Sequence, residues 1–124
     1  MITRVVGVFC ALLLAFVAAP ANAALTEAPR LAAVYDTILQ ANFDRVDDRL
    51  KDTCPPAPEE ACKALAAVAV WWEIQLDPNS RRLDNKLNTV ASAAIAASEA
   101  WARREPERAE AWFYLAGSYA PLVQ

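Results

Sequence analysis

The side chains best suited to chemistry in this sequence are two cysteines, a group of aspartates and a pair of adjacent tryptophans. Histidine is missing from all 124 residues, which removes the commonest general base, the usual haem ligand and most catalytic zinc sites. No serine or cysteine has a basic partner in a recognisable nucleophile motif. We therefore expect a protein that is not an enzyme and carries no cofactor.

Cys54 and Cys62 lie close together in one short segment. In an oxidising compartment such a pair favours a disulfide. A zinc site is the rival interpretation, but two thiols without histidine do not complete a four-ligand structural site. Two free buried thiols remain the other alternative.

Acidic side chains gather in the segment before these cysteines, as Asp44, Asp47, Asp48 and Asp52. Carboxylates on one helix face can hold calcium, but basic residues are interleaved here and the spacing of an EF-hand loop is missing. Glu73 and Asp77 lie one helical turn apart near two arginines, which favours a salt-bridged helix end over an acid–base pair. We interpret both groups as solvated charge, and a small metal-binding or enzyme domain as the weakest alternative.

Trp71 and Trp72 are the most unusual neighbours in the chain. Adjacent residues of a helix point about 100° apart, so one ring can face the core while the other meets a neighbouring helix or a ligand. Tryptophan is enriched at binding hot spots. The alternative is that both rings simply pack within the protein.

The N-terminal segment indicates export. Arg4 is followed by an apolar run over residues 5–19 and by the small-x-small pattern of residues 20–23. The run of about 15 residues is shorter than the roughly 20 that a permanent membrane helix needs. Cys10 lies near the start of this run, whereas a lipidated cysteine should follow it, so a lipid anchor is not expected. We therefore predict a signal peptide over residues 1–23. The product should be exported, to the periplasm or outside the cell, without a permanent membrane span.

The remaining domain, residues 24–124, is expected to be all-α. Alanine is abundant and only two glycines occur in the whole chain, a composition typical of helices. Loss of Arg4 leaves eleven basic against fifteen acidic residues, a net charge of −4. A mildly acidic chain lacks the basic footprint of a nucleic-acid-binding protein, so no nucleic-acid partner is expected.

Apolar spacing and prolines divide this domain into five expected helices. The first runs over residues 27–41, with Thr26 as N-cap and an apolar face of Leu31, Val34, Tyr35, Ile38 and Leu39. A short charged helix follows residue 42, and Pro58 begins a third helix that is apolar on nearly every side and is expected to be surrounded by protein. The fourth, capped by Asn79 or Ser80, carries the stripe Leu83, Leu87, Val90, Ala94, Ala97 and Trp101. The fifth begins near residue 107.

The fifth segment carries a family resemblance. Trp112-x-x-Leu115-Ala116-x-x-Tyr119 resembles the opening helix of a tetratricopeptide repeat, and Pro106 lies where the proline closing the preceding repeat belongs. Ala94 takes the small-residue position of the second helix, whereas Ser98 departs from the expected aromatic. The same frame recurs over residues 46–58. The resemblance covers residues 31–124, most specifically 89–119.

This resemblance implies antiparallel helix-turn-helix pairs stacked as a short tetratricopeptide-like α-solenoid, in a divergent exported bacterial protein. The residues that would pack its repeats are Val46, Leu50, Trp71, Ala94, Trp101, Pro106, Trp112, Leu115 and Tyr119. The first helix of each pair would line a groove, here through Leu65, Ala69, Trp72, Glu110, Phe113 and Gly117. A core role for Leu65, Trp72 and Phe113 is the alternative.

The function that the resemblance implies is non-catalytic binding of a protein or peptide. The alternative is a structural cap of a larger repeat protein with no ligand of its own. Because the last helix ends in apolar residues, we expect the sequence to be an N-terminal fragment, or a partner to complete its core.

Overall fold

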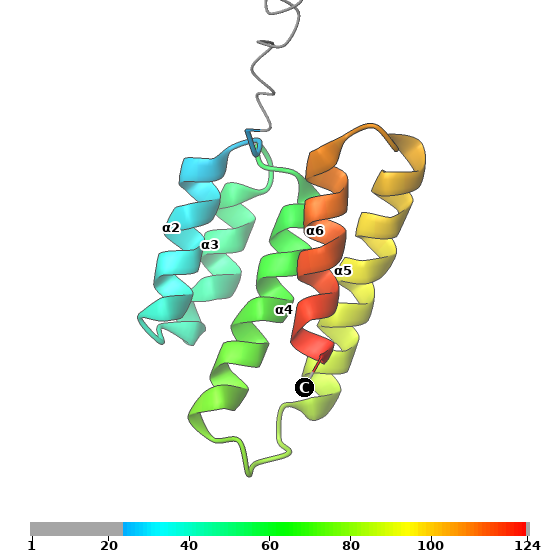
Figure 1. The fold of residues 1–124 in the computed structure, drawn as a ribbon. Coiled ribbons are helices and arrows are strands. Elements are labelled where there is room, and N and C mark those ends of the chain that lie inside the picture. The colour runs from blue at the N-terminus through cyan, green and yellow to red at the C-terminus, as the bar shows by residue number, and fades with distance from the viewer. Residues whose placement is uncertain (1–23, 124) are drawn as a thin grey trace, which may run out of the picture.

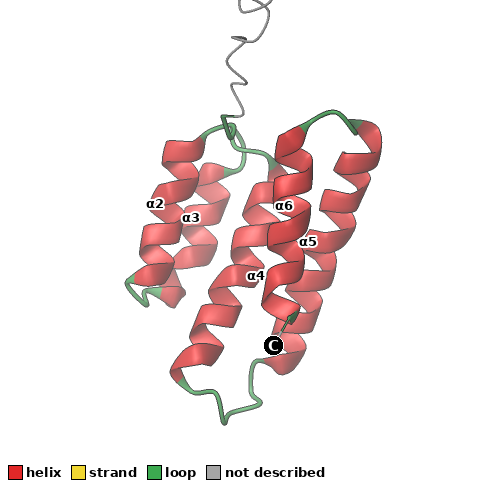
Figure 2. Cartoon of the chain, viewed as in Figure 1, coloured by secondary structure: helices red, strands yellow, loops and turns green. Residues whose placement is uncertain are grey.

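The computed structural model describes residues 24–123, and the expected signal peptide over residues 1–23 lies outside this range. Every described element is helix or loop (Figure 2), so the prediction of an all-α protein is confirmed. The elements in chain order are α2 (Ala28–Leu39), the 3-10 turn η1 (Phe43–Arg45), α3 (Val46–Thr53), α4 (Glu59–Leu76), α5 (Asp84–Arg104), α6 (Ala109–Tyr119) and the 3-10 turn η2 (Ala120–Leu122). Within this range no helix is both long and apolar enough to cross a membrane.

Helix α4 is the centre of the fold (Figure 1). It contacts α2 and α3 on one side and α5 and α6 on the other. Its buried positions carry small side chains, and Ala61, Ala64, Ala67 and Ala69 are between 0 and 7% exposed. Small side chains let helix axes approach closely. The prediction that this helix is surrounded by protein is therefore confirmed.

Helices α2 and α3 form the first packed pair. Leu31, Val34 and Ile38 of α2 are buried as predicted, but Tyr35 and Leu39 are 37 and 54% exposed because they lie outside the arc that contacts α3 and α4. The prediction of Thr26 as N-cap is wrong. Glu27 takes the cap position without a side-chain hydrogen bond, and Thr26 instead bonds Glu110 of α6.

The proline-containing turn after α3 carries the predicted disulfide. Cys54 and Cys62 are bonded, with their Cα atoms 6.3 Å apart. Cys54 follows the last residue of α3 and Cys62 lies in the first turn of α4. The bond therefore fixes the corner between the first helix pair and the central helix.

Helix α5 begins at Asp84, after Leu83, with no side-chain cap, so the predicted caps Asn79 and Ser80 lie too early in the chain. Its buried stripe also differs from the prediction, because Ala91 and Ser98 are fully buried in place of Val90 and Ala97. Both stripes run from Leu83 to Trp101 with the mean period of a helix, so they differ in which side of the seam is buried and not in period. Helix α5 contacts both α4 and α6, so its packed face is wider than the single seam that the prediction assumed.

The contact between α5 and α6 uses a different face of α6 from the one expected. Trp101 of α5 stacks on Tyr114, with ring centroids 6.2 Å apart, and the hydroxyls of Ser98 and Ser118 lie 3.3 Å apart. Ala111, Tyr114 and Ser118 are buried. Trp112 and Tyr119, expected to fill this gap, lie on the exposed side at 52 and 44% exposure.

Replacing Cys54 with serine is expected to lower the free energy of unfolding by about 2–3 kcal/mol under oxidising conditions, because the unfolded chain loses a closed loop. With reductant present, the wild type and the variant should unfold alike. Chemical denaturation in both conditions measures this. An equal difference between the two proteins with and without reductant would contradict it.

Replacing Tyr114 with alanine is expected to lower the free energy of unfolding by about 3–5 kcal/mol, because a buried, stacked ring leaves a cavity. The matched change Trp112→Ala should cost only about 1–2 kcal/mol, since half of that ring already meets water. Denaturation of both variants measures the difference. A larger loss for Trp112 than for Tyr114 would show that α6 packs in the register that the repeat resemblance implies.

Candidate interaction surface

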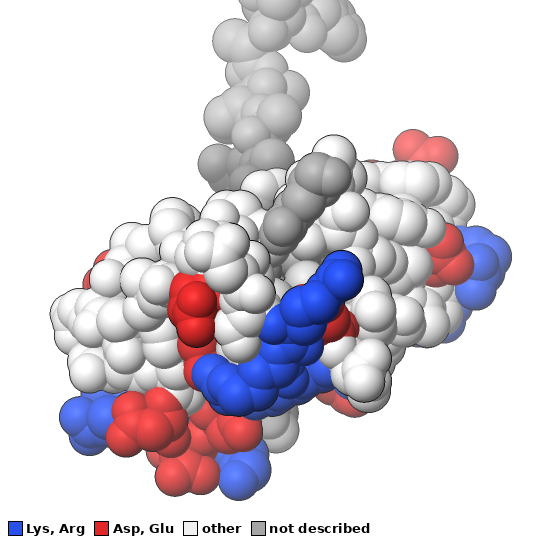
Figure 3. Space-filling model, turned by 90° about the horizontal axis from the view of Figure 1, so that it is seen from below, with Lys and Arg blue, Asp and Glu red and all other residues white. Residues whose placement is uncertain are grey.

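The exposed side of α6 concentrates large apolar side chains. Trp112, Phe113 and Tyr119 are 52, 56 and 44% exposed, and Ala116 and Gly117 lie between them on the same helix. We call these five residues the α6 face. The chain carries no charged residue after Glu110. Acidic and basic side chains gather in patches on the face of the molecule that Figure 3 shows from below. Contiguous exposed apolar surface marks interaction sites in folded proteins.

Helix α6 is held in its orientation by a network around its first turn. The Arg108 guanidinium donates to Glu110 Oε2 at 2.8 Å and to Glu105 Oε2 at 3.1 Å, and lies 5.2 Å from the Trp101 ring centroid. Glu110 accepts hydrogen bonds from the Thr26 amide at 2.7 Å and the Thr26 hydroxyl at 3.0 Å. The start of the described chain is thus tied to the last helix.

This network fixes the charge of the buried Glu110 carboxylate. Burial by itself raises the pKa of Glu110, but hydrogen bonds from Arg108 and Thr26 outweigh it and hold the pKa below the ordinary value of 4.5. Burial and the nearby Glu110 charge together raise the pKa of Tyr114 to about 12. Glu110 is therefore ionised and Tyr114 neutral at physiological pH, so the α6 orientation does not vary with their titration there.

The polar atoms of the α6 face already have partners within the chain. The Trp112 indole N–H donates to the Pro106 carbonyl at 2.8 Å. The Tyr119 hydroxyl donates to Glu99 Oε1 at 2.9 Å, which raises the pKa of Tyr119. The Phe113 ring stands edge-on to Tyr114, with centroids 5.1 Å apart. What this face offers to another molecule is therefore apolar ring surface.

The helix surface is open at Gly117, one helical turn beyond Phe113. Gly117 is the only glycine of the described residues, and a Cβ atom added there would meet no atom within 4 Å. The helix backbone is consequently open to approach at this position, beside a ring that projects from the same helix. Side chains three and four residues apart lie on one helix face.

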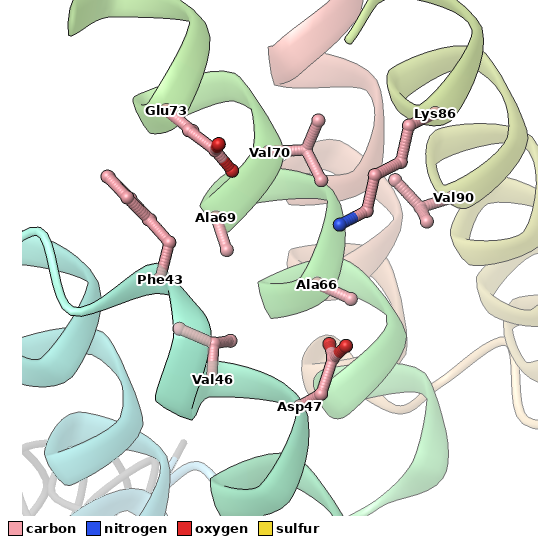
Figure 4. Close-up of a pocket in the computed structure, with 9 residues that line it drawn as sticks. All are labelled: Phe43, Val46, Asp47, Ala66, Ala69, Val70, Glu73, Lys86 and Val90. Atoms are coloured by element: carbon pink, nitrogen blue, oxygen red, sulfur yellow. The ribbon is translucent and has the colours of Figure 1, made fainter.

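A small cavity, the α3–α5 groove, lies where α4 separates two helices that do not contact each other. Phe43, Val46, Ala66, Ala69, Val70 and Val90 supply its apolar lining (Figure 4). Asp47 and Lys86 lie on its opposite sides. Its volume of about 40 Å³ is far below the several hundred of a small-molecule site. It has room for one water or one small apolar group.

The six residues predicted to line a groove fall into two groups. Phe113 is exposed, and Leu65, Trp72 and Gly117 are half-buried on the neighbouring helices α4 and α6. Ala69 is 7% exposed and lines the α3–α5 groove, and Glu110 is 8% exposed within the Arg108 network. These last two offer little surface to a ligand at the α6 face.

The residues predicted to pack the repeats are also divided. Val46, Leu50, Ala94 and Trp101 are buried, Trp71 and Leu115 are half-buried, and Pro106, Trp112 and Tyr119 are exposed. Trp71 meets Trp72 in a T-shaped contact, with centroids 5.0 Å apart. Trp71 packs with the α4–α5 contact and Trp72 with the main core.

Other acidic groups form surface ion pairs. The carboxylate of Glu73 lies 3.1 Å from Arg82, and that of Asp84 lies 3.1 Å from Arg81. The described residues contain no group of three or more side chains placed to bind a metal ion. The aspartates of the α3 segment face solvent.

Sequence reasoning missed Thr26, Arg108 and Tyr114 as the residues that orient α6. The Arg108–Glu110 pair is visible as neighbouring opposite charges, but nothing in the sequence links it to Thr26, which is 84 positions away from Glu110. Tyr114 lies beside the motif that carries the repeat resemblance and outside its spacing.

Replacing Glu110 with glutamine is expected to destabilise the protein at neutral pH and to weaken its acid sensitivity. A carboxylate with a lowered pKa contributes stability above its unfolded pKa and loses it as pH falls through the folded pKa. Melting temperatures measured from about pH 6 to about pH 3 should therefore fall less steeply in the variant. Glu107→Gln, on the exposed loop before α6, is the matched control. Parallel curves for wild type and Glu110→Gln would contradict the role of this network.

Comparison of the chain with known proteins finds no relative. No family model, curated protein or solved structure matches the chain. The role of the α6 face is therefore inferred from its own contacts and chemistry.

Proposed function

We propose that this chain is a non-catalytic, exported helical-repeat protein that binds a protein or peptide through the α6 face and the adjoining surface of α4. The observation that carries the proposal is the exposure of Trp112, Phe113 and Tyr119 on a helix whose opposite side is buried. Tryptophan and tyrosine dominate binding hot spots because they bury large areas with few rotatable bonds. Their fixed orientation limits the entropy that binding must overcome.

The order of helix contacts supports the helical-repeat part of the proposal. Alternate helices α2, α4 and α6 contact in sequence, while α3 and α5 do not contact each other. Stacked helix pairs give this order, because the first helix of each pair touches both neighbours. Together with the resemblance of residues 89–119 to a tetratricopeptide repeat, it favours a short solenoid.

The disulfide supports the exported part of the proposal. The Cys54–Cys62 bond is of a kind that persists in oxidising compartments such as the periplasm or the extracellular space. The apolar N-terminal segment with its small-x-small motif would direct the chain there.

A structural unit without a ligand of its own is the second candidate. It is favoured by the burial of Ala69 and Glu110, which leaves only part of the expected groove accessible. In that case the α6 face would only pack against a further helix of the same repeat protein, and it would bind no separate protein or peptide.

Site-specific photo-cross-linking in the cells that produce the protein separates these functions. A photoreactive amino acid at Phe113 should give a discrete adduct with one protein, because this ring projects from the α6 face. The same amino acid at Asp48, exposed on the charged side of α3, is the control. If position 113 gives no more adduct than position 48, the chain does not bind a partner through α6.

A further inference from the structure

We propose that the partner at the α6 face is a second copy of this chain, so that two copies pair through α6 about a two-fold axis. This inference rests on the proposed binding function and names its partner.

Charge restricts where two copies can meet. The mature chain would carry a net charge of −4, and like charges brought together at an interface are unfavourable. Residues 111–123 contain no charged side chain. The acidic groups beside this face, Glu99 and Glu105, are each paired with an arginine, Arg103 and Arg108 respectively. Two acidic chains can therefore approach through the α6 face without bringing unpaired like charges together.

The chemistry of the face selects a helix as its occupant. Trp112 and Tyr119 have used their donors on Pro106 and Glu99, so an extended peptide lying here would leave its backbone N–H and C=O groups unpaired. A helix satisfies these groups internally. The surface that fits the α6 face is therefore an uncharged helix surface that needs no hydrogen bonds from its partner. The α6 helix of a second copy supplies such a surface.

The shape of the face is self-complementary. Phe113 projects, while Gly117 leaves open space one turn later. When two copies of α6 pack antiparallel about a two-fold axis, the Phe113 ring of each copy lies against Gly117 of the other. Such an isologous contact uses each feature twice and closes on itself, whereas a head-to-tail contact would continue into a filament.

The available area sets the strength of the pairing. Aromatic side chains bury roughly 150–250 Å² each when fully enclosed, so three rings about half exposed offer at most about 300 Å² per copy, because Trp112 and Phe113 point about 100° apart. Stable dimers bury about 800 Å² per partner. The dimer should therefore be weak and should dissociate on dilution.

Sedimentation velocity of the purified disulfide-bonded domain over a wide concentration range tests the proposal. The wild type should shift from monomer to dimer as concentration rises. Phe113→Ser removes the projecting ring, and Gly117→Arg fills the open space at residue 117 and adds charge to the face. Each variant should raise the dimer dissociation constant by at least about tenfold. Ser92→Arg, which adds the same charge at an exposed position of α5, should leave it unchanged.

Gly117→Arg also separates pairing from folding. A Cβ atom at this position meets nothing in its own chain, and glycine is the poorer helix former, so the melting temperature should hold or rise while pairing is lost. If this variant unfolds, Phe113→Ser decides alone.

Three outcomes would overturn the inference: a wild type that stays monomeric throughout, a dimer that survives both substitutions, or a dimer equally weakened by Ser92→Arg. The cross-link at position 113 then shows whether the proposed function fails with it. An adduct with a different protein would keep the binding function and exclude the second copy, whereas an adduct of twice the chain mass would support both.

Discussion

Close packing around the alanines of α4 is the constraint on which the other helices depend. Ala61 and Ala67 have no exposed surface, and α4 is the element that contacts both α2–α3 and α5–α6. Since interiors are packed as densely as organic crystals, larger side chains there would push α2 and α3 away from α5 and α6. These two sets of helices are joined through α4, so its small side chains set the distance between them.

The orientation of α6 depends on a second, polar constraint. Glu110 is buried with its charge compensated by Arg108 and by two hydrogen bonds from Thr26, and Tyr114 stacks on Trp101 beneath it. A buried carboxylate is costly unless every acceptor site is used, so this arrangement admits little rotation of the helix. The same fixed rotation turns Trp112 and Phe113 outward, which is why a stabilising network in the interior also creates the candidate binding surface.

The small size of the domain limits how much apolar surface its core can bury, and the disulfide and the α6 face relate to this limit in different ways. About a hundred residues bury a modest core, and a covalent bond between α3 and α4 adds stability without further apolar area. The α6 face leaves apolar area outside that core, where pairing with another helix surface would bury it. In the proposed dimer, the two copies would associate through apolar helix–helix packing, which is also the contact that joins the helices within each copy.

Much of this protein followed from the sequence alone. Local rules determined the all-α class, the breaks at Pro58 and Pro106, and the burial of Leu31, Val34 and Ile38, because each depends on periodicity or backbone restriction. The short separation of Cys54 and Cys62 favoured a disulfide over free thiols or zinc, and the structure decided for the disulfide. Only the tertiary structure decided which side of α6 faces inward. The spacing of a motif fixes which residues share a helix face. Whether that face points to the core or to solvent depends here on Trp101 of another helix and on Thr26 near the start of the described residues. Contacts between residues so far apart along the chain leave no local sequence pattern that would predict them.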